Sequence, residues 1–180
     1  EKYHWPVGRT IFQKIAFVAT QEGLPTGLTF KRSSFGPFST ELKSLIAKLA
    51  NHQLIQENKL GRMLEVKVGP TYRDARKAYA VEFEKWESTI DKVADLFLRT
   101  NTNQAEVIAT VLFAANELTK ASPEKPTECD VYSSVLLWKQ KRRPPIEEGE
   151  VASTIRNLAA LKWLNVKPSK DLPVPEEAWL

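Results

Sequence analysis

The amino-acid sequence predicts a mostly α-helical protein with two winged-helix-like halves joined by a long amphipathic helix, and with a small β-hairpin wing in the first half. Three observations predict this fold class. Residues 8–69 read as helix, helix and hairpin, which is the element order of a winged helix. Residues 71–99 repeat apolar side chains at steps of three and four. Residues 101–180 resemble a second, poorly winged copy of the first unit.

Length sets the expected domain organisation. The chain has 180 residues, enough for one large domain or two small ones with a genuine core. We expect a winged-helix-like unit at 1–70, a connecting helix at 71–100 and a second helical unit at 101–180, together forming one compact structural domain. Because the chain begins with Glu1 rather than Met, we also expect a piece of a longer protein.

Composition narrows the classes of partner. A net charge of +4 and a pI near 9.1 permit a nucleic-acid or acidic-protein partner without requiring one. No apolar run approaches the roughly 18 residues of a membrane span, and no signal-peptide pattern is present, so we expect no membrane partner. The single cysteine, Cys129, excludes an internal disulfide and fits the reducing cytoplasm.

The first half begins with a buried helix and a connection rich in turn residues. Thr10–Glu22 is apolar almost all round, and Gly23 ends it. Leu28–Arg32 has the composition of a short strand, after which Gly36 permits an unusual backbone angle and turns the chain. Ser39 is a suitable N-cap for the next helix. The apolar stripe of that helix is Leu42, Leu45, Ile46 and Leu49.

A hairpin and the long helix follow. Leu54–Glu57 and Met63–Val68 alternate apolar and polar residues around a Gly-containing turn, which predicts the wing. Thr71 and Asp74 have the spacing of a capping box, and about seven helical turns without Gly or Pro come after it. The apolar stripe of this helix is Tyr72, Ala75, Tyr79, Phe83, Trp86, Ile90, Val93 and Phe97. Its acidic residues are Glu82, Glu84, Glu87, Asp91 and Asp95.

The second half predicts three helices. Asn103 and Glu106 have capping-box spacing for the first, and Thr127 caps the second, which carries Val131, Val135 and Trp138. Two consecutive prolines at 144–145 break the chain before the third. The stripe of the third helix is Val151, Ile155, Leu158 and Ala159.

No combination of residues predicts catalysis, a cofactor or a metal. His4, His52 and Cys129 lack the short spacings of zinc ligands, and neither GxGxxG nor GxxxxGK[ST] occurs. The carboxylate pairs Glu147–Glu148 and Glu176–Glu177 adjoin prolines or the chain end, which favours solvent over a dry cleft. We therefore expect a non-enzyme without cofactor, metal or small-molecule substrate.

The basic residues have two open interpretations. A phosphate-binding face forms if the fold brings together Arg9, Lys31–Arg32, Arg62 in the wing turn and the run KQKRR at 139–143. The alternative is ordinary solvated charge. The helix expected to enter a major groove, Ser39–His52, offers only two lysines, whereas such helices present several Arg, Asn or Gln.

The stretch KRSSFGPFSTEL, residues 31–42, is also open to two interpretations. Phe35 and Phe38 either fill the core as hydrophobic plugs or are exposed beside Arg32 and Ser34 as anchors of an interface.

A longer segment carries a family resemblance. GRTIFQKIAFVATQEGLPTGLTFKRSSFGPFSTELKSLIAKL resembles the R-T/L-Q-K helix, the G-L/I-P-x-G turn and the [YF]-G-P-[YF]-x-x-[ED]-L turn that begin the C-terminal domain of DarG antitoxins. QAEVIATVLFAA and IRNLAALKWL resemble two later segments of that family, so the resemblance extends over about Val7–Leu164. YwgA-like proteins of unknown role share the first half.

The resemblance implies a toxin-binding function. DarG antitoxins join a macrodomain, which removes ADP-ribose from DNA, to a domain that binds DarT, an NAD-dependent toxin that modifies single-stranded DNA. No macrodomain sequence occurs in this chain. The resemblance therefore implies an antitoxin domain that inhibits a DarT-type toxin by occupying its DNA-binding surface as a DNA mimic. The alternative is a winged-helix DNA-binding protein, such as an autoregulator.

The positive net charge departs from what a whole-chain DNA mimic requires, because a basic surface is repelled from a DNA-binding groove. Mimicry then depends on local acidic patches at 82–95 and 147–150, or the interface depends mainly on shape and apolar burial. The partner-binding residues that we expect are Arg32, Ser34, Phe35, Arg62, Glu84, Glu87, Asp91, Glu147 and Glu148.

Overall fold

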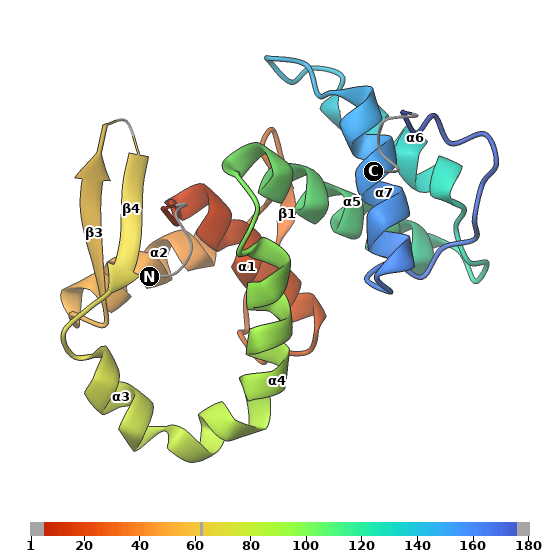
Figure 1. Ribbon diagram of the computed structural model, residues 1–180. Helices are drawn as coiled ribbons and strands as arrows, with labels where there is room; N and C mark the ends of the chain where they lie inside the picture. Colours follow the sequence, from red (N-terminus) through yellow and green to blue (C-terminus); the bar gives the residue numbers. More distant parts are fainter. Residues whose placement is uncertain (1–5, 62, 176–180) are drawn as a thin grey trace. The chain divides into compact units, whose positions relative to one another are not determined.

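The computed structural model describes residues 6–61 and 63–175. Within these residues lie seven α-helices and two two-stranded sheets (Figure 1), which confirms the prediction of a mostly α-helical fold with a small hairpin. The chain forms two compact units. Unit 1 comprises Glu1–Arg32 and Pro37–Ala105, and unit 2 comprises Ser33–Gly36 and Glu106–Leu180. The expected three-part domain organisation stays a prediction.

The elements follow one another closely along the chain. In order they are α1 (Arg9–Gln21), β1 (Lys31–Ser33), β2 (Gly36–Phe38), α2 (Thr40–Asn51), β3 (Ile55–Leu60), β4 (Met63–Val68), α3 (Tyr72–Ala78), α4 (Ala80–Phe97), α5 (Thr102–Ala121), α6 (Glu128–Lys139) and α7 (Glu148–Ala160). No helix in the described part of the chain has the length and apolar character to cross a bilayer.

The core of unit 1 is built around α1. Because α1 is apolar on most of its faces, it packs against several neighbours, α4 and β4 among them. Phe17 of α1 meets Phe30 edge to face, with ring centroids 5.4 Å apart. Burial of each large apolar side chain contributes roughly 1.5–3 kcal/mol. The buried apolar residues in the described part of this unit are Ile11, Phe17, Val18, Ala19, Leu42, Ile46, Val93, Phe97 and Ala105.

Two buried polar residues of α1 fix the segment that enters α2. The Gln13 side chain donates to the Ser39 carbonyl and accepts from the Ser39 N–H, both at 2.9 Å. Lys14 Nζ donates to the Pro37 carbonyl at 2.8 Å. Ser39 is also the predicted N-cap, since its hydroxyl accepts from the Leu42 N–H at 3.2 Å. These buried polar groups are thus satisfied by hydrogen bonds.

The predicted wing hairpin is confirmed. β3 and β4 pair antiparallel, with Ile55 opposite Val68 and Leu60 opposite Met63, so the first strand is longer than expected. The outer side of β4 is also occupied, because the Val66 N–H donates to the Val7 carbonyl at 2.8 Å. A second hairpin, β1–β2, lies between α1 and α2 where the sequence predicts one short strand.

The prediction of one uninterrupted helix over 71–99 is wrong. α3 ends at Ala78 and α4 begins at Ala80, with Tyr79 between them at φ −110° and ψ 28°, so that the chain bends there (Figure 1). No Gly or Pro explains the break. Packing does, because α4 lies against α1 while α3 buries no side chain. Tyr79, which was expected on the apolar stripe, is 61% exposed.

Two predicted helix caps are also wrong. The Thr71 side chain makes no cap hydrogen bond and donates instead to the His52 carbonyl at 2.9 Å. At the start of α5 the reciprocal bonds join Asn101 and Gln104, at 2.9 and 3.0 Å, two residues before the predicted pair. Thr71 and Glu106, which local spacing assigned to these caps, instead bind residues far away in the sequence, namely His52 and Lys139.

Unit 2 is assembled from α6, α7 and most of α5. α6 begins at the predicted Thr127 with a complete capping box, in which Thr127 and Asp130 bond to each other's backbone N–H. The extended chain after α7 makes an isolated parallel bridge between Thr127 and Lys167. The buried apolar residues include Val107, Val111, Val131, Val135, Val151 and Ile155.

Candidate interaction surfaces

A stripe of exposed carboxylates runs along α4. Glu84, Glu87, Asp91 and Asp95 are all exposed and follow one another at intervals of three and four residues. This spacing places them on one face of the helix, over about 16 Å at 1.5 Å per residue. Three of the expected partner-binding residues are therefore neighbours on one surface.

The stripe has little internal neutralisation. Glu87 lies 3.5 Å from Arg76, but both side chains are more than half exposed, so the pair contributes little. Arg76 also lies over the ring of Phe83, 5.8 Å from its centroid. Glu84 and Asp91 form no ion pair within the described residues. The stripe is accordingly open to a cationic partner.

The turn between β1 and β2 exposes an aromatic ring. Phe35 is 56% exposed, which rules out the interpretation that it is a plug of the core, and Ser34 beside it is exposed as well. Gly36 ends the turn with φ +86° and is buried, as expected from its need for an unusual backbone angle. Arg32, on β1, is exposed.

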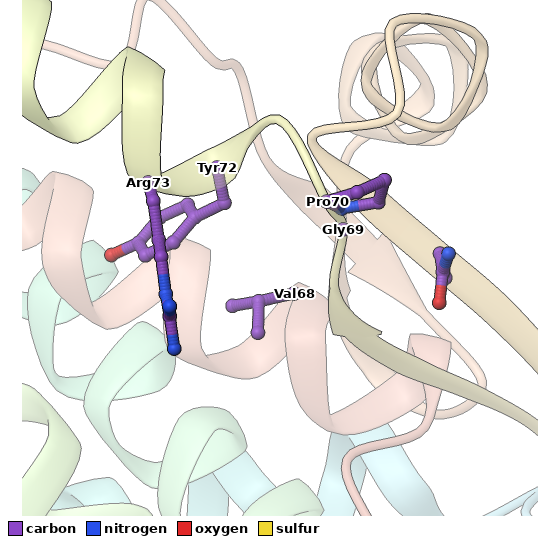
Figure 2. A pocket seen from close by; sticks show the side chains of 6 residues that line it. Val68, Gly69, Pro70, Tyr72 and Arg73 are labelled. Atoms are coloured by element: carbon purple, nitrogen blue, oxygen red, sulfur yellow. The ribbon is translucent and has the colours of Figure 1, made fainter.

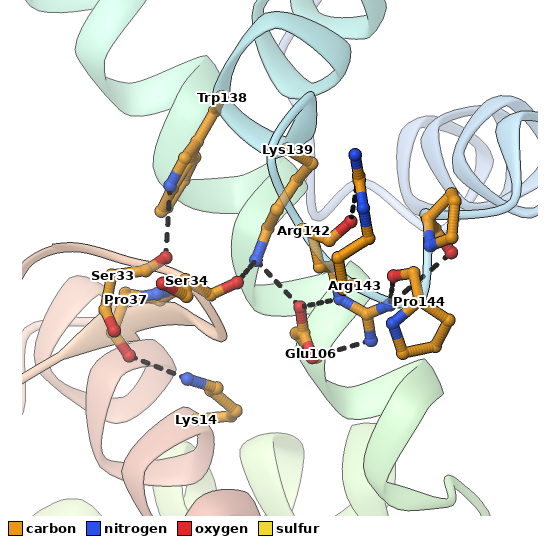
Figure 3. A network of polar contacts seen from close by, with 11 residues as sticks. Lys14, Ser33, Ser34, Pro37, Glu106, Trp138, Lys139, Arg142, Arg143 and Pro144 are labelled. Carbon is orange, nitrogen blue, oxygen red and sulfur yellow. Dashed lines mark hydrogen bonds and ion pairs between the residues drawn. The ribbon is translucent and has the colours of Figure 1, made fainter.

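The backbone of this turn is bound by two consecutive residues of α6. Trp138 Nε1 donates to the Ser33 carbonyl at 3.1 Å, and Lys139 Nζ donates to the Ser34 carbonyl at 2.8 Å (Figure 3). Both contacts use main-chain oxygens. The side chains of Ser34 and Phe35 are therefore not consumed in holding the turn.

A buried ion cluster supports this contact. Lys139 Nζ lies 2.7 Å from Glu106 Oε1, and Arg142 binds the same carboxylate through two bonds of 2.9 and 3.2 Å (Figure 3). The Lys139 and Glu106 side chains are only 1% and 4% exposed. Burial acts to raise the pKa of Glu106, but hydrogen bonds from Arg142 and Lys139 outweigh it and hold that pKa below its ordinary value. Burial lowers the pKa of Lys139, although Glu106 opposes this.

The cluster corrects both interpretations for two residues of the KQKRR run, while Lys141 and Arg143 are exposed and both interpretations stay open for them. Lys139 and Arg142 are neither phosphate-binding nor merely solvated, because they neutralise Glu106 inside unit 2. Two sequence signals could have indicated this. Glu106 lies within an apolar helix, where a carboxylate needs a cation, and Lys139 continues the four-residue repeat of Val131 and Val135.

The remaining expected residues lie elsewhere. Glu147 and Glu148 are exposed at the start of α7, where the helix dipole stabilises negative charge. Glu148 Oε2 accepts a long hydrogen bond from the Tyr132 hydroxyl at 3.4 Å. Arg62, like His4 and Glu176–Glu177, lies outside the described residues.

An open pocket lies where β4 leads into α3 (Figure 2). It has a volume of about 580 Å³ and is lined by Gln56, Val68, Gly69, Pro70, Tyr72 and Arg73. Gly69 is sterically required, since an added Cβ would lie 2.0 Å from the Gln53 carbonyl oxygen. An aromatic ring and an exposed guanidinium at one pocket suit a flat or anionic group.

No three His, Cys, Asp or Glu side chains gather into a possible metal site within 6–61 and 63–175. The candidate surfaces in the described part of the chain are the acidic stripe of α4, the β1–β2 turn that exposes Phe35, and the open pocket between β4 and α3.

Comparison with known proteins gives one informative similarity. No family model matches the chain. Over 110 residues the chain is 26% identical to a protein of Thermus aquaticus described as a DNA ADP-ribosyl glycohydrolase. The alignment covers 61% of this chain but 31% of that protein, so the chain spans about a third of the relative's length. The similarity accords with a relationship to DarG proteins, whose motifs the sequence resembles.

Proposed function

We propose that this chain is the toxin-binding part of a DarG-type antitoxin and inhibits a DarT-type DNA ADP-ribosyltransferase by occupying its single-stranded-DNA-binding surface. The observation that carries the proposal is the alignment with the DNA ADP-ribosyl glycohydrolase, which leaves most of that relative outside the match. A partner-binding role, rather than the relative's hydrolysis, is the assignment that the motif resemblance supports.

The acidic stripe of α4 is the surface that we assign to mimicry of DNA. Carboxylates four residues apart are separated by about 6 Å along a helix axis. That spacing is of the same order as the separation of successive phosphates on a nucleic-acid strand. A preformed helix presents the charges without further ordering, which lowers the cost of association. The positive charge of the whole chain is then compatible with mimicry, because close contacts feel the local charge most strongly.

Charge reversal on the stripe tests the proposal. We expect the triple variant Glu84→Lys, Glu87→Lys, Asp91→Lys to inhibit the toxin at least ~100-fold more weakly, since like charges replace complementary ones across the interface. The measurement is ADP-ribosylation of a single-stranded oligonucleotide by the purified toxin while the chain is titrated. Glu82→Lys, on another face of α4, is the control for a charge reversal outside the stripe. Equal inhibition by the triple variant would contradict mimicry by this face.

A second function, a winged-helix DNA-binding protein, is favoured by one observation. The pocket beside the β3–β4 hairpin combines Tyr72 with the exposed Arg73, a pairing suited to a nucleotide. Binding to duplex DNA across a range of salt concentrations distinguishes the two functions, because phosphate contacts give a steep negative slope. Tight, salt-dependent DNA binding without toxin binding would replace our proposal with this one.

A further inference from the structure

We propose that the Ser33–Gly36 turn is a preformed binding loop in which Phe35 anchors the chain in an apolar pocket of its protein partner, with Trp138, Lys139 and Glu106 as positioning residues. The partner is the toxin of the proposed function, on which this inference rests. The anchor is distinct from the α4 stripe: it lies in unit 2, and its interaction is apolar.

The conformation of the loop is fixed before binding. The carbonyls of Ser33 and Ser34 are each held by a donor from α6, and buried Gly36 closes the turn in a backbone conformation that favours glycine. Fixing the backbone of one residue costs roughly 1–2 kcal/mol of conformational entropy. A loop that is already ordered avoids this cost when it binds.

The two donors from α6 are themselves immobilised. Lys139 is buried and bound to Glu106, which Arg142 holds through two further bonds. Trp138 packs against Phe113 with ring centroids 5.4 Å apart. A lysine is rarely buried without such pairing. The cluster therefore holds Lys139 in the position from which it binds the Ser34 carbonyl.

The exposed ring of Phe35 differs from other exposed apolar side chains because its backbone is held in place. Single exposed apolar residues are ordinary on protein surfaces, and Leu161 of unit 2 is more exposed, at 67%. Phe35 differs because its ring projects from a turn whose main chain is bound on both preceding carbonyls. Aromatic side chains on rigid supports are characteristic of the residues that dominate binding energy at interfaces.

The turn itself is uncharged, which suits burial in an apolar pocket of a protein. The four residues SSFG carry no charge. The cation that contacts them, Lys139, is 1% exposed and bound to Glu106, so a phosphate cannot reach it. The exposed cations Lys31 and Arg32 precede the turn on β1, so a comparison with single-stranded oligonucleotide binding separates a protein contact from a nucleic-acid contact.

The main experiment compares Phe35→Ala with Leu161→Ala in binding to the purified toxin by calorimetry. We expect Phe35→Ala to weaken binding by about 30-fold or more, the loss typical of an interface anchor. Leu161→Ala should change affinity by less than about twofold. Thermal melting checks that both variants, each altered at an exposed position, are folded.

The positioning role has its own readout. Lys139→Met removes both hydrogen bonds of the ammonium group and keeps an apolar stem. We expect it to reduce the association rate of the toxin, because the Ser34 carbonyl is no longer held by α6. In the Phe35→Ala background the same change should have almost no further effect on affinity, because an absent anchor needs no positioning. Should Lys139→Met fail to fold, Trp138→Phe, which removes one donor from the turn, provides the same cycle.

Each outcome decides between the proposals. If the unaltered chain does not bind the toxin, both the proposed function and this inference are wrong. If it binds and Phe35→Ala binds equally well, the inference is wrong while the function stands. If Phe35→Ala retains toxin binding but loses binding to a single-stranded oligonucleotide, the loop is a nucleic-acid contact and the inference is overturned.

Discussion

At the scale of single residues, Glu106 shows how burial changes the meaning of a charge. Its capping-box spacing with Asn103 suggested a local role at the start of a helix. The structure instead places its carboxylate in the interior of unit 2, with Lys139 and Arg142 as donors. The partners lie more than 30 residues away in sequence. Local spacing carries no information about such a contact, which is why the interpretations of Lys139 and Arg142 failed.

Glu106 also makes the stability of unit 2 depend on pH. Its pKa in the folded state lies below its ordinary value of 4.5. The ionised form is therefore favoured by folding, and its contribution is complete above the unfolded pKa and lost as the pH falls through the folded pKa. Glu106→Gln should lower the free energy of unfolding at neutral pH by about 3–5 kcal/mol, because it leaves buried cations unpaired.

Urea unfolding followed from neutral to acid pH tests this expectation. The difference between the unaltered chain and Glu106→Gln should shrink below about pH 4.5, as the carboxylate of the unaltered chain becomes protonated. Glu124→Gln, at an exposed position, is the control and should follow the unaltered chain. A difference that stays constant with pH would show that the ionised carboxylate is not the source of the stabilisation.

At the scale of elements, apolar periodicity predicted the helices correctly wherever tertiary packing did not interrupt them. α1, α2, α6 and α7 lie where apolar stripes and the caps Ser39 and Thr127 placed them, because these signals are local. The break at Tyr79 was not predictable in the same way, since no Gly or Pro interrupts residues 71–99. It arises from contacts between α4 and α1. Strands of three residues, such as β1 and β2, are too short to show a period.

The two predicted threonine caps give a matched comparison. Thr127→Ala should lower the free energy of unfolding by about 1 kcal/mol, since it removes both the hydroxyl acceptor and the capping box of α6. Thr71→Ala should cost less, because it removes one exposed hydrogen bond to the His52 carbonyl and no cap. Chemical denaturation of the two variants provides the measurement, and an equal loss would show that the capping geometry of α6 is not what stabilises it.

At the scale of the whole molecule, sequence motifs indicated a resemblance to DarG proteins but not the geometry of a site. Glu84, Glu87 and Asp91 were predicted together because one helix carries them, and their common face follows from helix periodicity alone. The support of Phe35 could not be predicted, because α6 lies about a hundred residues further along the chain. Only the folded chain shows which polar groups form internal hydrogen bonds and ion pairs and which are exposed to a partner.

The membership of Ser33–Gly36 in unit 2 has a consequence for dissecting the gene. A fragment of residues 101–180 would contain α5, α6 and α7 whole, yet it would lack the acceptors of the Trp138 indole and of one Lys139 hydrogen bond. We expect such a fragment to melt at a lower temperature than the same helices in the intact chain. A synthetic peptide spanning residues 28–42, added in trans, should recover part of the loss, whereas a version with Gly36→Val should not. Recovery of stability by the peptide would thus show that Ser33–Gly36 stabilise unit 2, although they lie far from its other residues in the sequence.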